Sequence, residues 1–424
     1  MMRHRRRIAG LSALLLLLMS ACGFAMDLWS NADGDKGVGL DVAGKWSSLL
    51  SHNPDAPILF TKRDSITEFF RLRLGLNGYY EDWFNWELAY EQRARWLSQG
   101  AGTGGGVLPS EVDAPFRIRQ FDWQIANDDE RFIWRHEIDR ALVSFHRQWG
   151  EVTLGRQAIG LGRGRLFSAV DIFSPFSPLE VDREWRQGVD AARVEYQLSD
   201  TSSVEVIAAL GQTWGKSALI ARARGYFGDI DAELIFGKRA EDLMVASVVS
   251  ASVMEAEVHC ELALYNTPEA QADGGIFDND HEVAKAVFGG SYTFDVGKGL
   301  TFLGEYHYSG FGLKDVGRAT DKLTEPTFAE RVIRGDTQTL GREAIAYQLS
   351  YPFSISLNGA FLVLHSPQDG SAVLSPSVMW DFSKSASLLG SIFIPCGEQP
   401  YDGKVKSEYG STPLSFFLQL RMYY

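Results

Sequence analysis

The sequence predicts an all-β protein: a single transmembrane antiparallel β-barrel of about 18 strands (16–18). Three observations support this fold class. Apolar and polar residues alternate along most of the chain, which is the period of a strand with two unlike faces. The chain opens with the pattern of an export signal, and its last residues form an alternating strand that ends on Tyr424.

The composition alone suggests two or three soluble domains, because 22% of the 424 residues are charged and the mean hydropathy is −0.12. A barrel explains the same average, since its lipid-facing and lumen-facing residues alternate. After the signal, no segment has the roughly 20 apolar residues of a spanning helix. The net charge of −13 disfavours nucleic acid as a partner.

Residues 1–25 form a signal peptide that we expect to be removed, with a basic stretch at 3–7 and an apolar stretch at 11–19. Two processing sites are compatible with it. One is a lipobox-like sequence in which Cys22 is lipidated, and the other is a small-x-small site at 23–25. We favour the second, because methionine fits the start of a lipobox poorly.

After the signal, 26–36 is a short polar lead and 37–424 forms the barrel. The number of predicted strands is even, as in bacterial single-chain barrels. They cover about 18 segments: 37–48, 66–80, 83–98, 132–148, 151–159, 189–198, 202–211, 216–227, 229–237, 241–252, 254–265, 282–295, 299–311, 338–351, 353–366, 371–382, 384–395 and 412–424.

The links between these strands are short at one end and long at the other. This asymmetry is expected of short periplasmic turns and long external loops. The long links are 49–65, 99–131, 160–188, 266–281, 312–337 and 397–411. The segment 117–125 also alternates. It is either a spanning strand, which would remove the strand near 37, or part of an external or inward-folded loop, which we favour.

The final strand has one apolar face. A half-buried edge strand of a soluble sheet would show the same alternation. With its terminal aromatic residue, however, it resembles the C-terminal assembly signal of bacterial outer-membrane barrels. The resemblance implies outer-membrane lipid and the barrel-assembly machinery as partners, and the Gram-negative outer membrane, reached through the periplasm, as location. The residues concerned are Phe416, Leu418, Leu420, Met422 and Tyr424.

One stretch resembles a narrower family. The pieces 154–157, 162–165 and 182–190, with 135–138 upstream, are similar to the alginate-export-like group of outer-membrane porins. There a strand ending in Gly-Arg-Gln leads into an Arg-rich loop. The resemblance implies a porin-like barrel and export of an anionic polysaccharide.

The link 160–188 is too long and too apolar for a solvated loop, and loops of this length are usually functional or disordered. We predict that it folds into the barrel mouth and narrows the pore. Alternatively, arginine–carboxylate pairs merely attach it to the wall, and both can hold together. Its candidate constriction residues are Arg163, Arg165, Asp182, Arg183, Glu184 and Arg186.

Strand parity places charged side chains in the lumen. The arginines crowd one wall and the glutamates the other, which predicts a transverse field; alternatively, they pair across strands and sort nothing. Arginines at 71, 73, 93 and 95 are the best candidates for binding carboxylate or phosphate groups. The lumen set is Arg71, Arg73, Arg93, Arg95, Arg193, Arg222, Arg224, Glu255, Glu257 and Glu261.

Arg156 is an exception, because it has the parity of lipid-facing Leu154. It lies either at the headgroup level or at a bulge that turns it inward.

The sequence contains no nucleophile elbow, no metal-ligand spacing and no pairing pattern for Cys260 and Cys396. We therefore expect no enzymatic activity, no cofactor and no metal. The predicted function is an outer-membrane porin for small polar or anionic solutes, with glycan export implied by resemblance. The alternatives are a barrel sheath around a partner, such as an electron-transfer conduit, or a receptor or adhesin barrel. A homo-oligomer or a periplasmic partner is compatible with each.

Overall fold

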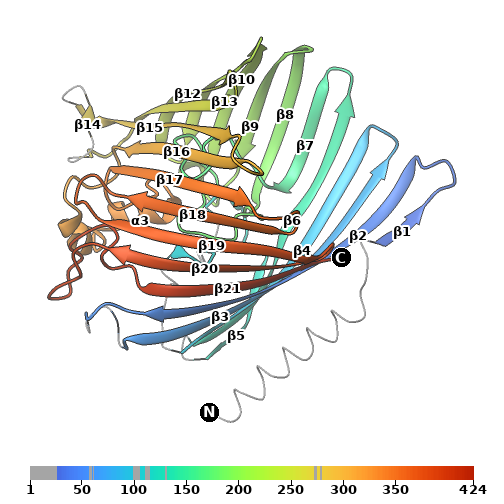
Figure 1. The fold of residues 1–424 in the computed structure, drawn as a ribbon. Coiled ribbons are helices and arrows are strands. Elements are labelled where there is room, and N and C mark those ends of the chain that lie inside the picture. Colours follow the sequence, from blue (N-terminus) through green and yellow to red (C-terminus); the bar gives the residue numbers. More distant parts are fainter. Residues whose placement is uncertain are drawn as a thin grey trace.

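Consecutive strands of the wall pair antiparallel, and the last strand returns to the first. The structure, a computed structural model, describes residues 26–56, 60, 62–98, 106–109, 115–128, 131–271, 275–276 and 279–424. Within these residues, 21 strands form one sheet. Three are short additions and the other 18 make the barrel (Figure 1). The pairing of Ala43–His52 with Leu414–Tyr423 closes it, which confirms the predicted fold class.

The elements follow the predicted order. The barrel strands are β2 (Lys36–His52), β3 (Asp64–Tyr80), β4 (Phe84–Leu97), β6 (Phe132–Arg147), β7 (Gly150–Gln157), β8 (Val189–Ser199), β9 (Ser202–Ala209), β10 (Ala218–Phe227), β11 (Ile230–Arg239), β12 (Asp242–Val253), β13 (Ala256–Asn266), β15 (Asn279–Phe294), β16 (Leu300–Ser309), β17 (Glu343–Pro352), β18 (Leu357–His365), β19 (Ala372–Ser383), β20 (Ala386–Cys396) and β21 (Leu414–Tyr423). The additions are β1 (Met26–Ser30), β5 (Asp122–Asp128) and β14 (Gly275–Ile276).

Helices are few and short in the described part of the chain: η2 (Trp214–Lys216), η3 (Val316–Arg318), α2 (Ala319–Lys322) and α3 (Pro326–Arg334). None of the helices among the described residues has the length and apolar character needed to cross a membrane.

The two faces of the wall differ as the alternation predicts. On β11, Leu234 and Phe236 are 65% and 62% exposed on the outside, whereas Glu233 and Ile235 are buried inside the barrel. The neighbouring strands repeat this alternation. The exterior is therefore an apolar belt that fits the hydrocarbon of a bilayer, and the charged side chains face the lumen.

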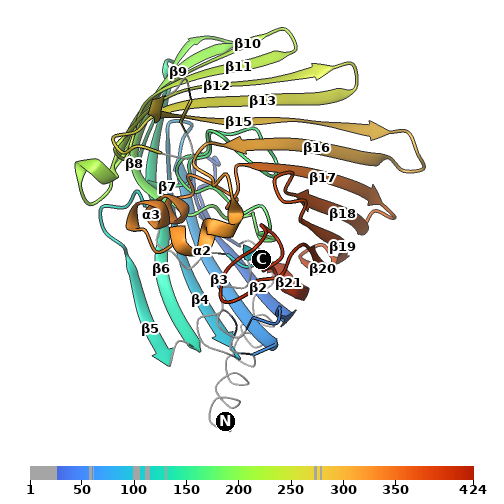
Figure 2. The same ribbon diagram turned by 90° about the vertical axis from the view of Figure 1, so that its left-hand side faces the viewer.

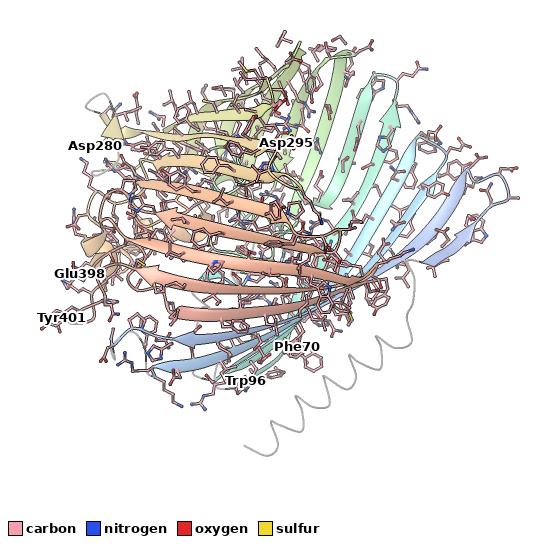
Figure 3. All side chains as sticks on the ribbon, in the orientation of Figure 1. Phe70, Trp96, Asp280, Asp295, Glu398 and Tyr401 are labelled. Atoms are coloured by element: carbon pink, nitrogen blue, oxygen red, sulfur yellow. The ribbon has the colours of Figure 1, made fainter. Side chains whose placement is uncertain are left out.

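The two rims of the barrel also differ. One carries only tight links, such as 148–149, 228–229 and 254–255, while the other carries the long loops 98–131, 158–188 and 310–342. Asp280 and Asp295 mark the two ends of one hairpin strand, and Glu398 lies at the long-loop rim with Asp280 (Figure 3). This is the predicted arrangement of periplasmic turns and external loops.

Aromatic rings surround the tight-turn rim. The contacting pairs are Tyr80–Trp83, Trp149–Tyr196, Tyr351–Phe353 and Trp380–Phe382, with ring centroids 5.2–6.1 Å apart. Rings of this kind anchor barrels at the membrane interface.

Two short strands fill positions that barrel strands leave open. β5 pairs with β6 beyond the point where β7 ends, so the segment 117–125 does not span the barrel. β1 pairs with β2 beyond the end of β21, so the expected polar lead 26–36 is partly strand. The reason is the same in both cases, because a longer neighbour offers unpaired backbone groups. The predicted signal peptide, 1–25, lies outside the described residues.

A lipid-facing arginine tests the belt. Leu234→Arg near the middle of β11 should lower the unfolding free energy by about 2–4 kcal/mol, whereas Ile230→Arg at the strand end should cost at most about 1 kcal/mol. Denaturant titration of the protein in lipid vesicles measures both. Equal costs at the two depths would contradict the belt assignment.

Candidate functional site

The loop between β7 and β8, residues 158–188, lies inside the barrel rather than above its rim. Phe167, Val170, Ile172 and Phe173 are each at most 1% exposed and pack in one cluster with wall residues such as Val287. We call this segment the inward loop. Its apolar residues explain why it leaves solvent and fills part of the lumen.

Two buried glutamates of the wall hold one side of the inward loop. Glu261 of β13 and Glu305 of β16 are 0% and 2% exposed. Successive backbone N–H groups surround each carboxylate, an arrangement that forms an anion-binding concavity. The donors to Glu261 are the N–H groups of Arg163, Gly164, Ala169 and Val170 and the Ser168 hydroxyl, at 2.5–3.3 Å. The donors to Glu305 are the N–H groups of Arg165, Leu166 and Phe167, at 2.5–3.0 Å.

Lys45 of β2 holds the other side. Its ammonium lies 2.6 Å from Asp182 and 2.6 Å from Glu184 and 3.7 Å from the centre of the Trp185 ring. Burial alone would raise the pKa of Asp182, but the charges of Lys45 and Arg71 lower it below its ordinary value. The inward loop therefore spans from a lysine on one wall to two glutamates on the other.

A second loop, 310–342, lies over the mouth of the barrel, where Figure 2 shows α2 and α3. Arg331 of α3 bonds Asp242 at the start of β12, at 3.0 and 3.1 Å. Gln338 donates to the Phe176 carbonyl and accepts from the Ser168 N–H. The two loops thus form one hydrogen-bonded unit inside the mouth.

The predicted lumen arginines of the early strands face inward, but each has a partner. Arg71 bonds Glu91 at 2.9 Å and Arg93 bonds Glu137 at 2.8 Å. Arg73 lies 2.6 Å from Asp139, and Arg95 donates to the Pro109 carbonyl. Carboxylates are thus interleaved with these arginines, as the alternative of pairing across strands predicts. The transverse field stays a prediction.

The other predicted lumen residues also form pairs. Arg222 bonds Glu205 and Glu233, Arg193 bonds Glu205, and Arg224 bonds Glu195 at 2.7 Å. Nearer the tight turns, Glu257 bonds Arg165 at 2.7 Å and Glu255 accepts from the Tyr292 hydroxyl.

The predicted residues of the inward loop are attached to the wall and to the loop itself. Arg163 bonds Asp231 and Glu233. Arg183 donates to four carbonyls of its own loop, those of Arg165, Ser177, Pro178 and Glu180. Arg186 bonds Asp171. The predicted attachment by arginine–carboxylate pairs is present, and whether these residues also narrow a pore stays a prediction.

No bulge in β7 turns Arg156 inward, because β7 keeps a regular register with both neighbours; its position at the headgroup level stays a prediction. Its guanidinium bonds Asp190 and the carbonyls of Ile138 and Arg119 and lies 5.1 Å from the centre of the Phe121 ring. The segment leading into β5 therefore covers it, and it is 3% exposed.

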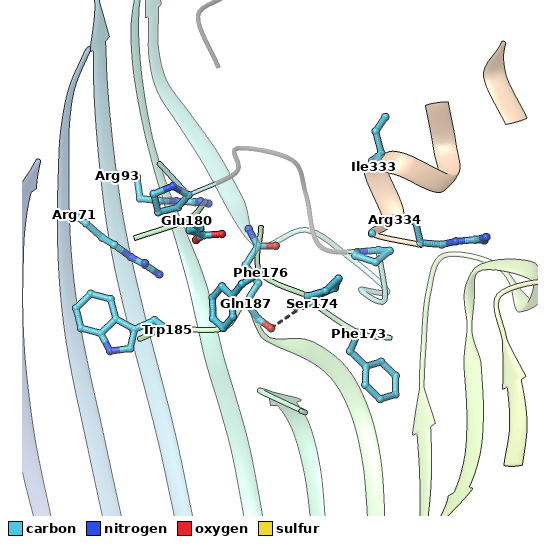
Figure 4. Close-up of a pocket in the computed structure, with 14 residues that line it drawn as sticks. Arg71, Arg93, Phe173, Ser174, Phe176, Glu180, Trp185, Gln187, Ile333 and Arg334 are labelled. Atoms are coloured by element: carbon cyan, nitrogen blue, oxygen red, sulfur yellow. Dashed lines mark hydrogen bonds between the residues drawn. The ribbon is translucent and has the colours of Figure 1, made fainter. Parts of the chain in front are cut away.

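A cavity of about 110 Å³ lies between the arginine side of the wall and the two loops. Arg71 and Arg93 face it from β3 and β4, and Trp185, Phe176 and Glu180 line it from the inward loop (Figure 4). Arg334 borders it from α3. Guanidinium groups beside aromatic rings and an amide, Gln187, can bind a small anion with an apolar part.

Several of these residues were not among the predicted site residues. Trp185 and Glu180 stand in the link 160–188 and Lys45 in the strand expected at 37–48, yet only contacts across the lumen show their roles. The bonds between Arg331 of α3 and Asp242 of β12 could not be anticipated, because no sequence pattern connects the two residues. No group of three or more His, Cys, Asp or Glu in the described residues could hold a metal ion.

The two wall glutamates can be tested directly. Glu305→Gln and Glu261→Gln each remove a charged acceptor, and hydrogen bonds to charged groups contribute about 1.5–3 kcal/mol each. We expect the amides of 163–170 to exchange hydrogen roughly 10–100-fold faster, measured by mass spectrometry. Glu398→Gln, at an exposed carboxylate of the long-loop rim, is the matched control. Unchanged exchange in both variants would mean that these carboxylates do not hold the loop.

Comparison with known proteins agrees with this architecture. No family model and no curated protein matches the sequence. Among solved structures, Acinetobacter baumannii OccAB1 superposes with a TM-score of 0.57 at 10% identity, over 94% of this chain and 98% of that one. OccAB4 of the same organism gives 0.55 at 10% identity, over 93% and 100%. Pseudomonas aeruginosa OccK9 (OpdG) gives 0.55 at 10%, over 92% and 98%. With its apolar belt and closed wall, the chain has the closed antiparallel β-barrel fold of these solved structures.

Proposed function

We propose that the barrel is a selective channel for small anionic solutes, carboxylates above all. The observation that carries the proposal is the cavity bordered by Arg71, Arg93 and Arg334 between the wall and the two loops. Its volume of about 110 Å³ equals roughly three to four water molecules at ~30 Å³ each. A short organic acid has this size.

The arginines would act by exchanging partners. Arg71 and Arg93 already bond Glu91 and Glu137, so their guanidinium groups are oriented before a solute arrives. A planar guanidinium has five donors and can bind a second carboxylate beside the first. Arg73 and Arg95 continue the row on the same two strands and are proposed to contact the solute in turn.

The alternative to small anions is export of an anionic glycan, which the alginate-export-like resemblance implies. A polymer would need the inward loop to leave the lumen, and the bonds to Glu261, Glu305 and Lys45 oppose that. A sheath around a partner protein would need the same space. Small solutes are therefore favoured. Assembly by the barrel-assembly machinery, a homo-oligomer and a periplasmic partner stay predictions.

The proposal is tested by single-channel recording of the purified barrel in a planar bilayer. We expect a preference for anions in a salt gradient, and brief current blocks when propionate is added. Arg71→Gln and Arg93→Gln should each weaken propionate block by about tenfold or more, because a charge-assisted hydrogen bond contributes about 1.5–3 kcal/mol.

Arg63→Gln is the matched control, since Arg63 pairs with Asp55 in an outer loop and is 55% exposed. Retention of the folded band on an unheated gel verifies that each variant has folded. A barrel that shows neither anion preference nor propionate block would refute the proposed function.

A further inference from the structure

Glu180 differs from the other side chains at the cavity. It is the one acidic side chain among the described residues that line it, and it faces the arginines of two wall strands (Figure 4). Its carboxylate accepts a long hydrogen bond, 3.4 Å, from the Ser177 N–H. The Glu91 and Glu137 carboxylates, in contrast, accept from arginines at 2.9 and 2.8 Å.

Charged groups approach Glu180 from each element packed around it. Arg71 of β3 and Arg93 of β4 come from the wall, and Arg334 comes from α3. Asp182 and Arg183 belong to its own loop. Three of these cations already bond other oxygen atoms. Arg71 bonds Glu91, and Arg334 bonds Asp336 and Asp242. Arg183 donates to backbone carbonyls. Within the described residues, the Glu180 carboxylate is thus held by the long bond from the Ser177 N–H rather than by an arginine.

We propose that Glu180 is a specificity-determining residue that makes the affinity of the cavity for anions depend on pH. This inference rests on the proposed function and concerns the same cavity. A charged Glu180 repels an anion bound between Arg71 and Arg93, and a neutral Glu180 does not. Among the described residues that line the cavity, the other groups that can carry a charge are arginines, which stay protonated.

The sign and the range of the effect follow from its surroundings. Burial raises the pKa of Glu180 to about 7, and the Ser177 bond and the Arg183 charge offset only part of that rise. Below this range Glu180 is neutral, so the cavity carries one more unit of positive charge and binds anions more tightly. Above it the carboxylate is charged and binding weakens.

Block by methanesulfonate tests this, because a sulfonate stays anionic throughout the range and does not titrate itself. In single-channel recordings of the full-length barrel, we expect the dissociation constant to be roughly fivefold lower at about pH 5.5 than at about pH 8, the size of a one-charge change in a partly screened site. Glu180→Gln should bind tightly at both pH values. Glu398→Gln, which removes an exposed carboxylate at the long-loop rim, should keep the wild-type pH dependence.

The outcomes separate this inference from the function on which it rests. Methanesulfonate block that depends on Arg71 but not on pH overturns the role of Glu180 and leaves the channel proposal intact. A pH dependence that survives in Glu180→Gln, or disappears in Glu398→Gln, also overturns it. If neither methanesulfonate nor propionate blocks the wild-type channel, the proposed function itself fails. The wild-type titration needs no variant to fold.

Discussion

The bonds between two wall carboxylates and the backbone of the inward loop determine the rest of the interior. Glu261 and Glu305 are buried, and a buried carboxylate is costly unless its oxygens are bonded. The loop satisfies them with consecutive N–H groups, which would be costly to bury unpaired themselves. The wall carboxylates and the loop N–H groups therefore satisfy each other's hydrogen bonds. The apolar cluster around Phe167 and the position of the cavity both follow from this contact.

On the opposite wall, the inward loop is attached by ion pairs of its side chains rather than by its backbone N–H groups. Lys45 binds two loop carboxylates, and the Trp185 ring lies against the cations of Lys45, Arg71 and Arg73. Cations over a desolvated aromatic face are stabilised by its quadrupole. The loop therefore presents N–H groups where the wall is acidic and acids where the wall is basic. This complementarity explains how a highly charged lumen can hold a largely apolar segment.

Strand positions were predictable because alternation and tight turns are local properties. Eighteen segments were expected, and the strands occupy the same regions, except at ends that tertiary contacts decide. The strand expected from 338 begins at Glu343, because Gln338 bonds the inward loop instead. Arg71, Arg93 and Arg222, which parity assigns to the lumen, are buried, and their contact with a solute stays a prediction. Parity could not reveal their partners, since Arg71–Glu91 depends on strand register and Arg71–Asp182 on a loop path. Arg156 shows the limit most clearly, because the residues that cover it are distant in sequence.

The pairing of β5 beside β6 means that the inward loop departs from within the wall, where β7 stops, rather than from the rim. The depth at which the inward loop enters the barrel is then decided by the length of one strand. Surface loops that make no contact with the inward loop do not set this depth, so they are free to change length and sequence. Pressure from antibodies or phages on the exposed rim could accordingly be met by mutation there while the transport pathway is preserved. In an engineered barrel, the same separation would let a surface loop be replaced by a foreign epitope.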